Sequence, residues 1–238
     1  LKGSFENSNI ISIQFPSNSE FQFIEKEAFS YSLIESLSIP SKLTDLQEEW
    51  CNCTQNLIRI LISPKNAKYS FFDGKFIIGK SSIENENFDE LVFCVRNIDT
   101  ATIPNFIERI CSCAFDNCKQ LRNIEFANDS KLQTINLKAF CESTIENIKI
   151  PSKLKQIGEK AFFYCEKLSR IKIEDDSELQ IIEKEAFAFS SIESITISSN
   201  LYQLKEKWCF MTPKLNEIVV SSKNPYYKSY EDKFIIGK

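Results

Sequence analysis

Apolar residues recur along this chain with a fixed period. Four strand-like segments begin 24, 23 and 24 residues apart, and positions i, i+3 and i+5 of each are apolar. They are residues 121–126, 145–150, 168–173 and 192–197. The alternation in the second half of each segment predicts a β-strand with one buried face. Further strand candidates lie at 10–15 and begin at Ile34 and Leu57. A period of 20–50 residues is typical of a solenoid.

A second sequence motif, Leu-x-x-Ile-x-x-x-Ala-Phe, recurs between the strands at 154–162 and 179–187. The apolar residues of this motif are expected to supply the opposite wall of the core. Its Glu-Lys-Glu-Ala-Phe sequence is compatible with a short helical turn. A string of amphipathic helices is the alternative. The strand segments are rich in Ile, Phe, Thr and Ser, and β-branched and aromatic residues favour strands. We therefore predict a repeat solenoid of the α/β type that is mostly β.

A larger repeat encloses the small one. Residues 20–80 align without gaps to 178–238, an offset of 158, with about half of the positions identical. Trp50-Cys51 and Trp208-Cys209 stand where other turns have Ala-Phe, so we expect each Trp to fill the volume of a Phe.

The regular spacing of the repeat is interrupted at residues 64–103. Asp73-Gly74 between aromatic residues predicts a type I′ β-hairpin. We predict a single array over 1–238, with a hairpin-rich insertion at 64–103 that leaves the solenoid and returns at 101–104. A second, truncated insertion is predicted to start at 222–238. The chain lacks an initiator Met and an apolar signal segment at its start, so we expect it to be a fragment.

Composition excludes several classes of function. The net charge of −4 gives no basic field for nucleic acid, and no run of 18 apolar residues could cross a membrane. The chain has no His, the residue used most often for acid–base catalysis and metal binding. We expect neither an enzyme nor a cofactor.

The nine cysteines are interpreted mainly as packed, free thiols. Cys118 and Cys165 share a repeat position that holds Ser in other turns, and two turns of separation put them roughly 10 Å apart, too far for a disulfide. Cys51-x-Cys53 and Cys111-x-Cys113 suggest metal, but a zinc site without His needs four thiolates. The repeat register places Cys113 on an outer turn, where it would be the most reactive thiol.

Two further motifs have weak support. Residues 74–81 match the phosphate-binding pattern G-x-x-x-x-G-K-S, yet the intervening residues read as a strand, no helical pattern follows, and Asp232 replaces the first Gly in the second copy. Asn52 and Asn128 match N-x-[ST], so they are possible glycosylation acceptors if the chain is secreted.

The wording of the repeat at 145–168, Leu/Ile-x-x-Ile-x-Ile-Pro-x-x-Leu-x-x-Ile-Gly-x-x-Ala-Phe-x-x-Cys-x-x-Leu, resembles the Treponema-type, or BspA-like, leucine-rich repeat. The Asn/Lys-rich wording is most similar to BspA-like surface antigens of trichomonad protists. The resemblance implies a right-handed horseshoe with a parallel sheet on its concave face, a cell-surface location, and adhesion to host or matrix proteins or glycans. It implies no catalytic residues.

If the strands pair in parallel, their outward residues form two polar rows on the concave face. We predict a partner-binding surface centred on Lys149, Arg170 and Lys172, with a merely soluble face as the alternative. Its residues are Asn123, Glu125, Asn147, Lys149, Arg170, Lys172, Ser194 and Thr196. The partner would be a protein or a glycan. An intracellular scaffold in the cytoplasm is the alternative function, and the free thiols are consistent with it.

Overall fold

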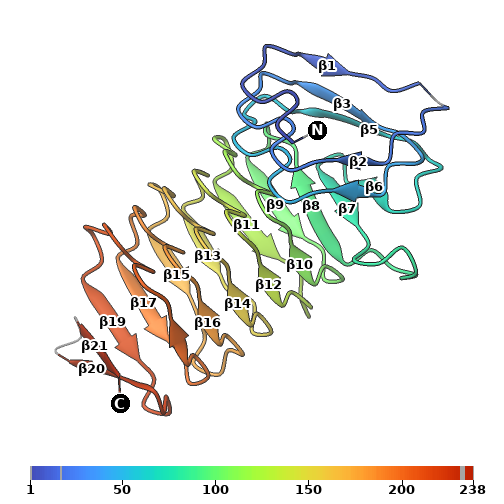
Figure 1. Cartoon of the computed structure of the whole chain (residues 1–238). Coiled ribbons are helices and arrows are strands. Elements are labelled where there is room, and N and C mark those ends of the chain that lie inside the picture. Colours follow the sequence, from blue (N-terminus) through green and yellow to red (C-terminus); the bar gives the residue numbers. More distant parts are fainter. Residues whose placement is uncertain (1, 17, 231–233, 238) are drawn as a thin grey trace.

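The chain folds into an all-β solenoid. The computed structural model describes residues 2–16, 18–230 and 234–237, and no helix occurs among them. Successive turns stack one on another, so that the N-terminus and the C-terminus lie at opposite ends of the array (Figure 1). Most turns contribute one strand to a first sheet and one to a second. The predicted solenoid with parallel sheets is confirmed.

The first sheet is built mainly from the strands that the hydrophobic pattern predicts. It has two parts, β1-β3-β5 near the N-terminus and β9-β11-β13-β15-β17-β19 in the rest of the array, and every pair within them is parallel. The strands are β1 (Ser12–Ile13), β3 (Ser36–Ile39), β5 (Arg59–Ile62), β9 (Thr100–Ile103), β11 (Asn123–Phe126), β13 (Asn147–Lys149), β15 (Arg170–Lys172), β17 (Ser194–Ile197) and β19 (Glu217–Val220).

The second sheet forms the opposite wall and consists mainly of two-residue strands. It is also divided, into β2-β4 and a longer part that runs from β18 to β8 and ends in a hairpin. The strands are β2 (Phe23–Ile24), β4 (Asp45–Leu46), β8 (Glu90–Cys94), β10 (Arg109–Ile110), β12 (Thr134–Ile135), β14 (Gln156–Ile157), β16 (Ile181–Ile182) and β18 (Gln203–Leu204).

The core between these walls is a column of identical side chains. Phe115, Phe140, Phe162 and Phe187 are fully buried, and neighbouring rings stack with centroids 4.7, 5.1 and 5.2 Å apart. Trp50 packs against Phe29 at 6.2 Å, so it fills the place that Phe occupies elsewhere, as predicted. Because each ring contacts the rings of the adjacent turns, the stability of one turn depends on its neighbours.

The Ala-Phe motif forms a non-helical segment that connects the second sheet back to the first, and we call this segment of each turn the arc. The prediction of a short helical turn there is wrong. Two residues in each regular arc have positive φ, such as Lys138 (52°) and Glu142 (55°). Residues with positive φ therefore interrupt the helical φ values of the arc, and this turns backbone N–H groups towards the next turn of the array. Phe140 N donates to Ala161 O at 2.8 Å, and Glu142 N donates to Phe163 O at 2.8 Å. In an α-helix these groups would bond within their own turn. Hydrogen bonding between turns therefore replaces the helix.

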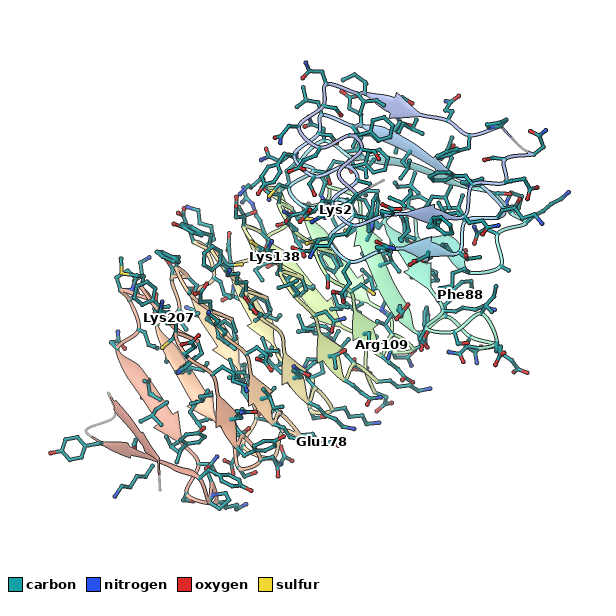
Figure 2. All side chains as sticks on the ribbon, viewed as in Figure 1. Lys2, Phe88, Arg109, Lys138, Glu178 and Lys207 are labelled. Atoms are coloured by element: carbon teal, nitrogen blue, oxygen red, sulfur yellow. The ribbon has the colours of Figure 1, made fainter. Side chains whose placement is uncertain are left out.

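The arcs line one edge of the array. Figure 2 shows Lys138 and Lys207, both residues with positive φ, along this edge, whereas Arg109 and Glu178 lie along the opposite edge.

The predicted hairpin is confirmed. β6 (Tyr69–Phe72) and β7 (Phe76–Gly79) pair antiparallel. Asp73 and Gly74 have φ values of 53° and 63°, and Lys75 N donates to Phe72 O at 3.0 Å, which defines a type I′ turn. A second hairpin, β20 (Tyr227–Tyr230) with β21 (Phe234–Gly237), lies within the predicted 222–238 segment. Asp232 lies outside the described residues.

The rest of the 64–103 segment returns into the sheets. β8 pairs antiparallel with β7 and parallel with β10, and β9 pairs parallel with β11. The prediction that this segment leaves the solenoid is corrected here, because β8 takes a place in the second sheet and β9 takes a place in the first. The backbone edges of β10 and β11 are thereby paired, which satisfies their hydrogen-bonding groups.

The first sheet is interrupted between β5 and β9. We call the region where the arc of the second turn packs against the arcs beyond this interruption the joint. The arc that follows β8 is short, so the arc of the second turn packs against arcs that lie further along the array. Cys53 N donates to Asp116 Oδ2 at 2.5 Å, and Lys138 Nζ lies 2.8 Å from Glu49 Oε2. These contacts join residues more than 60 positions apart in the sequence.

Candidate binding surface

The pairing of β11, β13, β15 and β17 aligns the predicted polar rows. Asn147 is the register partner of Asn123 on one side and of Arg170 on the other, and Arg170 is in turn the partner of Ser194. In the second row Lys149 stands beside Lys172. Adjacent strands lie about 4.8 Å apart. The predicted side-by-side arrangement of these residues is confirmed.

Alternation of burial turns these rows outward. Ile148, Ile171 and Ile195 point into the core, whereas the polar residues on either side of each are exposed or half-buried. The outward face contains a shallow hollow of about 590 Å³. Its polar lining consists of Asn147, Lys149, Arg170, Lys172, Ser194 and Thr196. We call these six residues the polar hollow.

The charges of the polar hollow are partly balanced. Glu174 Oε1 lies 3.0 Å from Lys172 Nζ and 3.4 Å from Lys149 Nζ. Hydrogen bonding and charge from Lys172 first, and then from Lys149, lower the pKa of Glu174. Arg170 makes no ion pair with another described residue. The guanidinium of Arg170 is thus an exposed cation that can form bidentate hydrogen bonds to a carboxylate or sulfate.

A second hollow of about 440 Å³ adjoins the polar hollow and shares Lys149 with it, and Glu174 lies on the wall of this second hollow. It is formed by the loops that follow β11 and β13, and Glu125 and Asn128 lie on its wall. Asn128 is exposed next to Asp129, which has a φ of 55°. Asn128 remains a predicted glycosylation acceptor, and a sugar there would stand beside the polar hollow.

Asn52 is a different case, because the structure buries it. Its side chain is 6% exposed, and its Oδ1 lies 3.7 Å from the Sγ of Cys113. The N-x-[ST] match predicted a surface turn, but the joint covers this arc. A glycan at Asn52 is incompatible with the folded structure.

The joint also corrects the prediction for Cys113. This thiol is fully buried rather than on an outer surface, and burial raises its pKa well above the usual value. A thiol in that state is a poor nucleophile. All nine cysteines are free thiols in this structure, and Cys118 and Cys165 are both fully buried.

Sequence reasoning missed Arg96, which is the central residue of the joint. Its guanidinium is buried and donates to the carbonyl oxygens of Thr54 (3.0 Å), Ala114 (2.8 Å), Cys94 (3.2 Å) and Cys113 (3.2 Å). It also lies 4.3 Å from the centre of the Phe93 ring. A lone Arg directly after the apolar run 91–95 was the available signal.

Arg96 also changes the chemistry of one thiol. Its Nη1 lies 3.4 Å from the Sγ of Cys118. Burial opposes ionisation of Cys118, but hydrogen bonding from Cys94 and the charge of Arg96 lower its pKa to about 7. Cys118 is therefore the thiol most stabilised as a thiolate, although it is not accessible from the surface.

The remaining motifs carry no site. Among the described residues no group of three or more Cys, Asp or Glu side chains is arranged to hold a metal ion. The phosphate-loop match falls on β7, a strand whose four residues are buried, and the hydroxyl of Ser81 donates to Asp89. Nor does the described part of the chain contain a helix with the length and apolarity needed to span a bilayer.

Comparisons with known proteins agree with this fold. The chain resembles the structure of the pneumococcal vaccine antigen PcpA at 19% identity and a TM-score of 0.58, over 97% of this chain and 47% of that one. It resembles a leucine-rich repeat protein from Eubacterium ventriosum at 17% identity and a TM-score of 0.64, over 93% and 66%. The chain thus spans about half of the first protein and just under two thirds of the second.

The family comparison is more specific than the structural one. No curated protein sequence matches the chain. Six copies of the BspA type leucine rich repeat region match residues 2–75 and 81–216. These ranges contain the arcs, the polar rows and all strands described above except β7, β19, β20 and β21. Since the match covers most of the sequence, the chain belongs to the BspA-type leucine-rich-repeat family.

Proposed function

We propose that this chain is a non-catalytic binding module of a cell-surface protein, and that the polar hollow binds a protein or glycan of a host surface or matrix. The observation that carries the proposal is the alignment of six polar residues on a rigid parallel sheet, with Arg170 free of an ion pair among the described residues. Solenoids use extended faces of this kind to bind partners. Resemblance to a vaccine antigen supports the surface location.

The test removes the cations of the polar hollow. In the K149A/R170A/K172A variant, binding to a panel of immobilised matrix proteins and glycans should fall at least tenfold. A matched control, K131A/K155A/K167A, removes the same charge from exposed lysines that line neither hollow and should bind like the parent chain. Equal binding by the two triple variants would reject the polar hollow as the contact surface.

A second candidate is an intracellular scaffold with the same surface. The nine free thiols favour it, because reducing compartments keep thiols free. Thiol titration of the protein purified from its native source, under denaturation and with or without reductant, separates the two. Nine titratable thiols favour the scaffold, whereas a disulfide or a glycan at Asn128 would place the chain outside the cell.

A further inference from the structure

The second sheet has a gap between β4 and β8. Within each part of this sheet, neighbouring strands pair through their backbones. At β4 the N–H of Leu46 is bound by a side chain instead, because it donates to the phenol oxygen of Tyr69 at 2.9 Å. Among the described residues β4 pairs with β2 and with no other strand. The wall of the solenoid is therefore open at this point.

A cleft of about 260 Å³ occupies this gap, and we call it the joint cleft. Its lining comes from β4 and the residues that follow it, from β6 and β8, and from the arcs after β10 and β12. Pockets for drug-sized ligands measure about 300–1,000 Å³, so the joint cleft suits a smaller molecule with a single ring. Its polar lining includes Asp45, Glu48, Trp50, Lys68, Ser112 and Asn136.

Two buried polar atoms in the wall of the joint cleft lack a partner. Trp50 and Ser112 both line the cleft and are 2% and 5% exposed. Neither Trp50 Nε1 nor Ser112 Oγ makes a hydrogen bond with another described residue. Buried donors without an acceptor are unfavourable and rare in folded proteins. An oxygen atom of a ligand in the cleft would supply the acceptor that the indole N–H lacks.

The rim of the joint cleft is acidic. Asp45 and Glu48 are exposed there, and neither forms an ion pair with another described residue. Lys68 also lines the cleft, but its Nζ donates to the carbonyl oxygen of Lys80. Two carboxylates without a counterion disfavour an anionic ligand. Nor do they belong to a group of described residues arranged to hold a metal ion.

We infer that the joint cleft binds one neutral sugar ring. Each sugar hydroxyl both donates and accepts, so neighbouring hydroxyls can donate to Asp45 and Glu48 while a sugar oxygen accepts from Trp50 Nε1. An ammonium group has only donors and would leave the indole N–H unpaired. A single peptide group has one donor and one acceptor, which is fewer than the lining requires. The joint cleft lies on the second sheet and the polar hollow on the first, so neither site depends on the other.

The probes are D-glucose, D-galactose, D-mannose and N-acetyl-D-glucosamine, each titrated against the intact chain. NMR follows the indole N–H signals of Trp50 and Trp208. We expect at least one sugar to shift the Trp50 signal saturably and to leave the Trp208 signal unchanged. Ethylammonium, inorganic phosphate and N-acetylglycinamide should give no saturable shift. If none of the four sugars shifts the Trp50 signal, or only one of the other three probes does, the inference is overturned.

Variants of the cleft wall test the two unpartnered atoms. Trp50→Phe removes the N–H donor but keeps an aromatic ring, which other turns have at this place. It should weaken sugar binding at least fivefold, measured by saturation-transfer NMR of the sugar. Trp208→Phe is the same change at the equivalent position of the larger repeat and should alter binding less than twofold. Equal affinities of these two variants would refute the contact.

Ser112→Ala tests the same wall independently of the tryptophan. The hydroxyl has no partner among the described residues, so its removal leaves no other group unpaired and the chain should fold normally. Sugar binding should weaken at least threefold, and unchanged binding would contradict a ligand contact at this hydroxyl.

Variants of the rim test the carboxylates. D45N/E48Q should weaken sugar binding at least fivefold, because it removes both charged acceptors. D176N/E178Q, at two exposed carboxylates of another turn, is the matched control and should bind like the parent chain. The K149A/R170A/K172A variant should also bind the sugar normally, so that failure of this site and failure of the polar hollow are distinguishable. Equal sugar binding by D45N/E48Q and D176N/E178Q would reject the joint cleft as the site.

Discussion

Replacement of Arg96 by Met tests whether one buried side chain stabilises the joint. The change keeps an unbranched side chain of similar length but removes every donor. The carbonyl oxygens of Thr54 and Cys94 then lose the guanidinium hydrogen bonds at 3.0 and 3.2 Å. A buried acceptor left without a donor costs about 1–3 kcal/mol, so two cost about 2–6 kcal/mol.

Two electrostatic effects modify this sum in opposite directions. Removing a buried cation relieves its desolvation, which by itself stabilises the variant. However, the charge of Arg96 opposes the effect of burial on the pKa of the carboxyl group of Asp116, and Met would remove that compensation. We therefore expect R96M to lower the free energy of unfolding by about 3 kcal/mol.

Urea unfolding followed by tryptophan fluorescence measures the loss. In a Trp208→Phe background the signal comes from Trp50, which packs against Phe93 at the joint. The control is R122M, at an exposed arginine of the same array, and should change stability by less than ~0.5 kcal/mol. If R96M and R122M unfold at the same urea concentration, the hydrogen bonds of Arg96 do not hold the joint.

Two further predictions concern packing and pH. Gly158→Ala should destabilise the array by about 1–3 kcal/mol in urea unfolding, because the new Cβ would lie 2.7 Å from the backbone carbon of Asn136. Lys205→Ala, at the same repeat position, is the control, and equal free energies of unfolding for the two variants would contradict the close approach. Burial raises the pKa of Cys51 and Cys165 to about 12, so the native state keeps protons that the unfolded chain releases above pH ~8.5. The stability that these two thiols contribute should therefore be complete below pH ~8.5 and fall as the pH rises from there towards 12, and constant urea midpoints between pH 9 and 10.5 would exclude native thiols of high pKa.

Local periodicity predicted the features that depend on neighbouring turns. The spacing of Ile148 and Ile171 placed both strands in one sheet, and the same spacing put Lys149 beside Lys172, as the register confirms. A solenoid allows this inference because each turn repeats the environment of the one before it. The use of the aligned residues in binding stays a prediction.

The arcs show where local pattern was insufficient. Glu-Lys-Glu-Ala-Phe has good helix formers, and single-turn reasoning favours a helical turn. The competing hydrogen bonds, such as that from Phe140 N to Ala161 O, come from the next turn. Positive φ at residues such as Lys138 costs roughly 1–2 kcal/mol each, and stacking of the turns compensates it.

The repeat in the sequence determines the strands, the core column and the rows of the outward face, because each of these involves residues one period apart. Only the folded array decides that Asn52 and Cys113 are buried and that Arg96 is central. Those three residues meet because the arc after β8 is short, which brings the second turn against the fourth. Contacts across 61 residues depend on the path of the whole intervening chain, which no periodic pattern records.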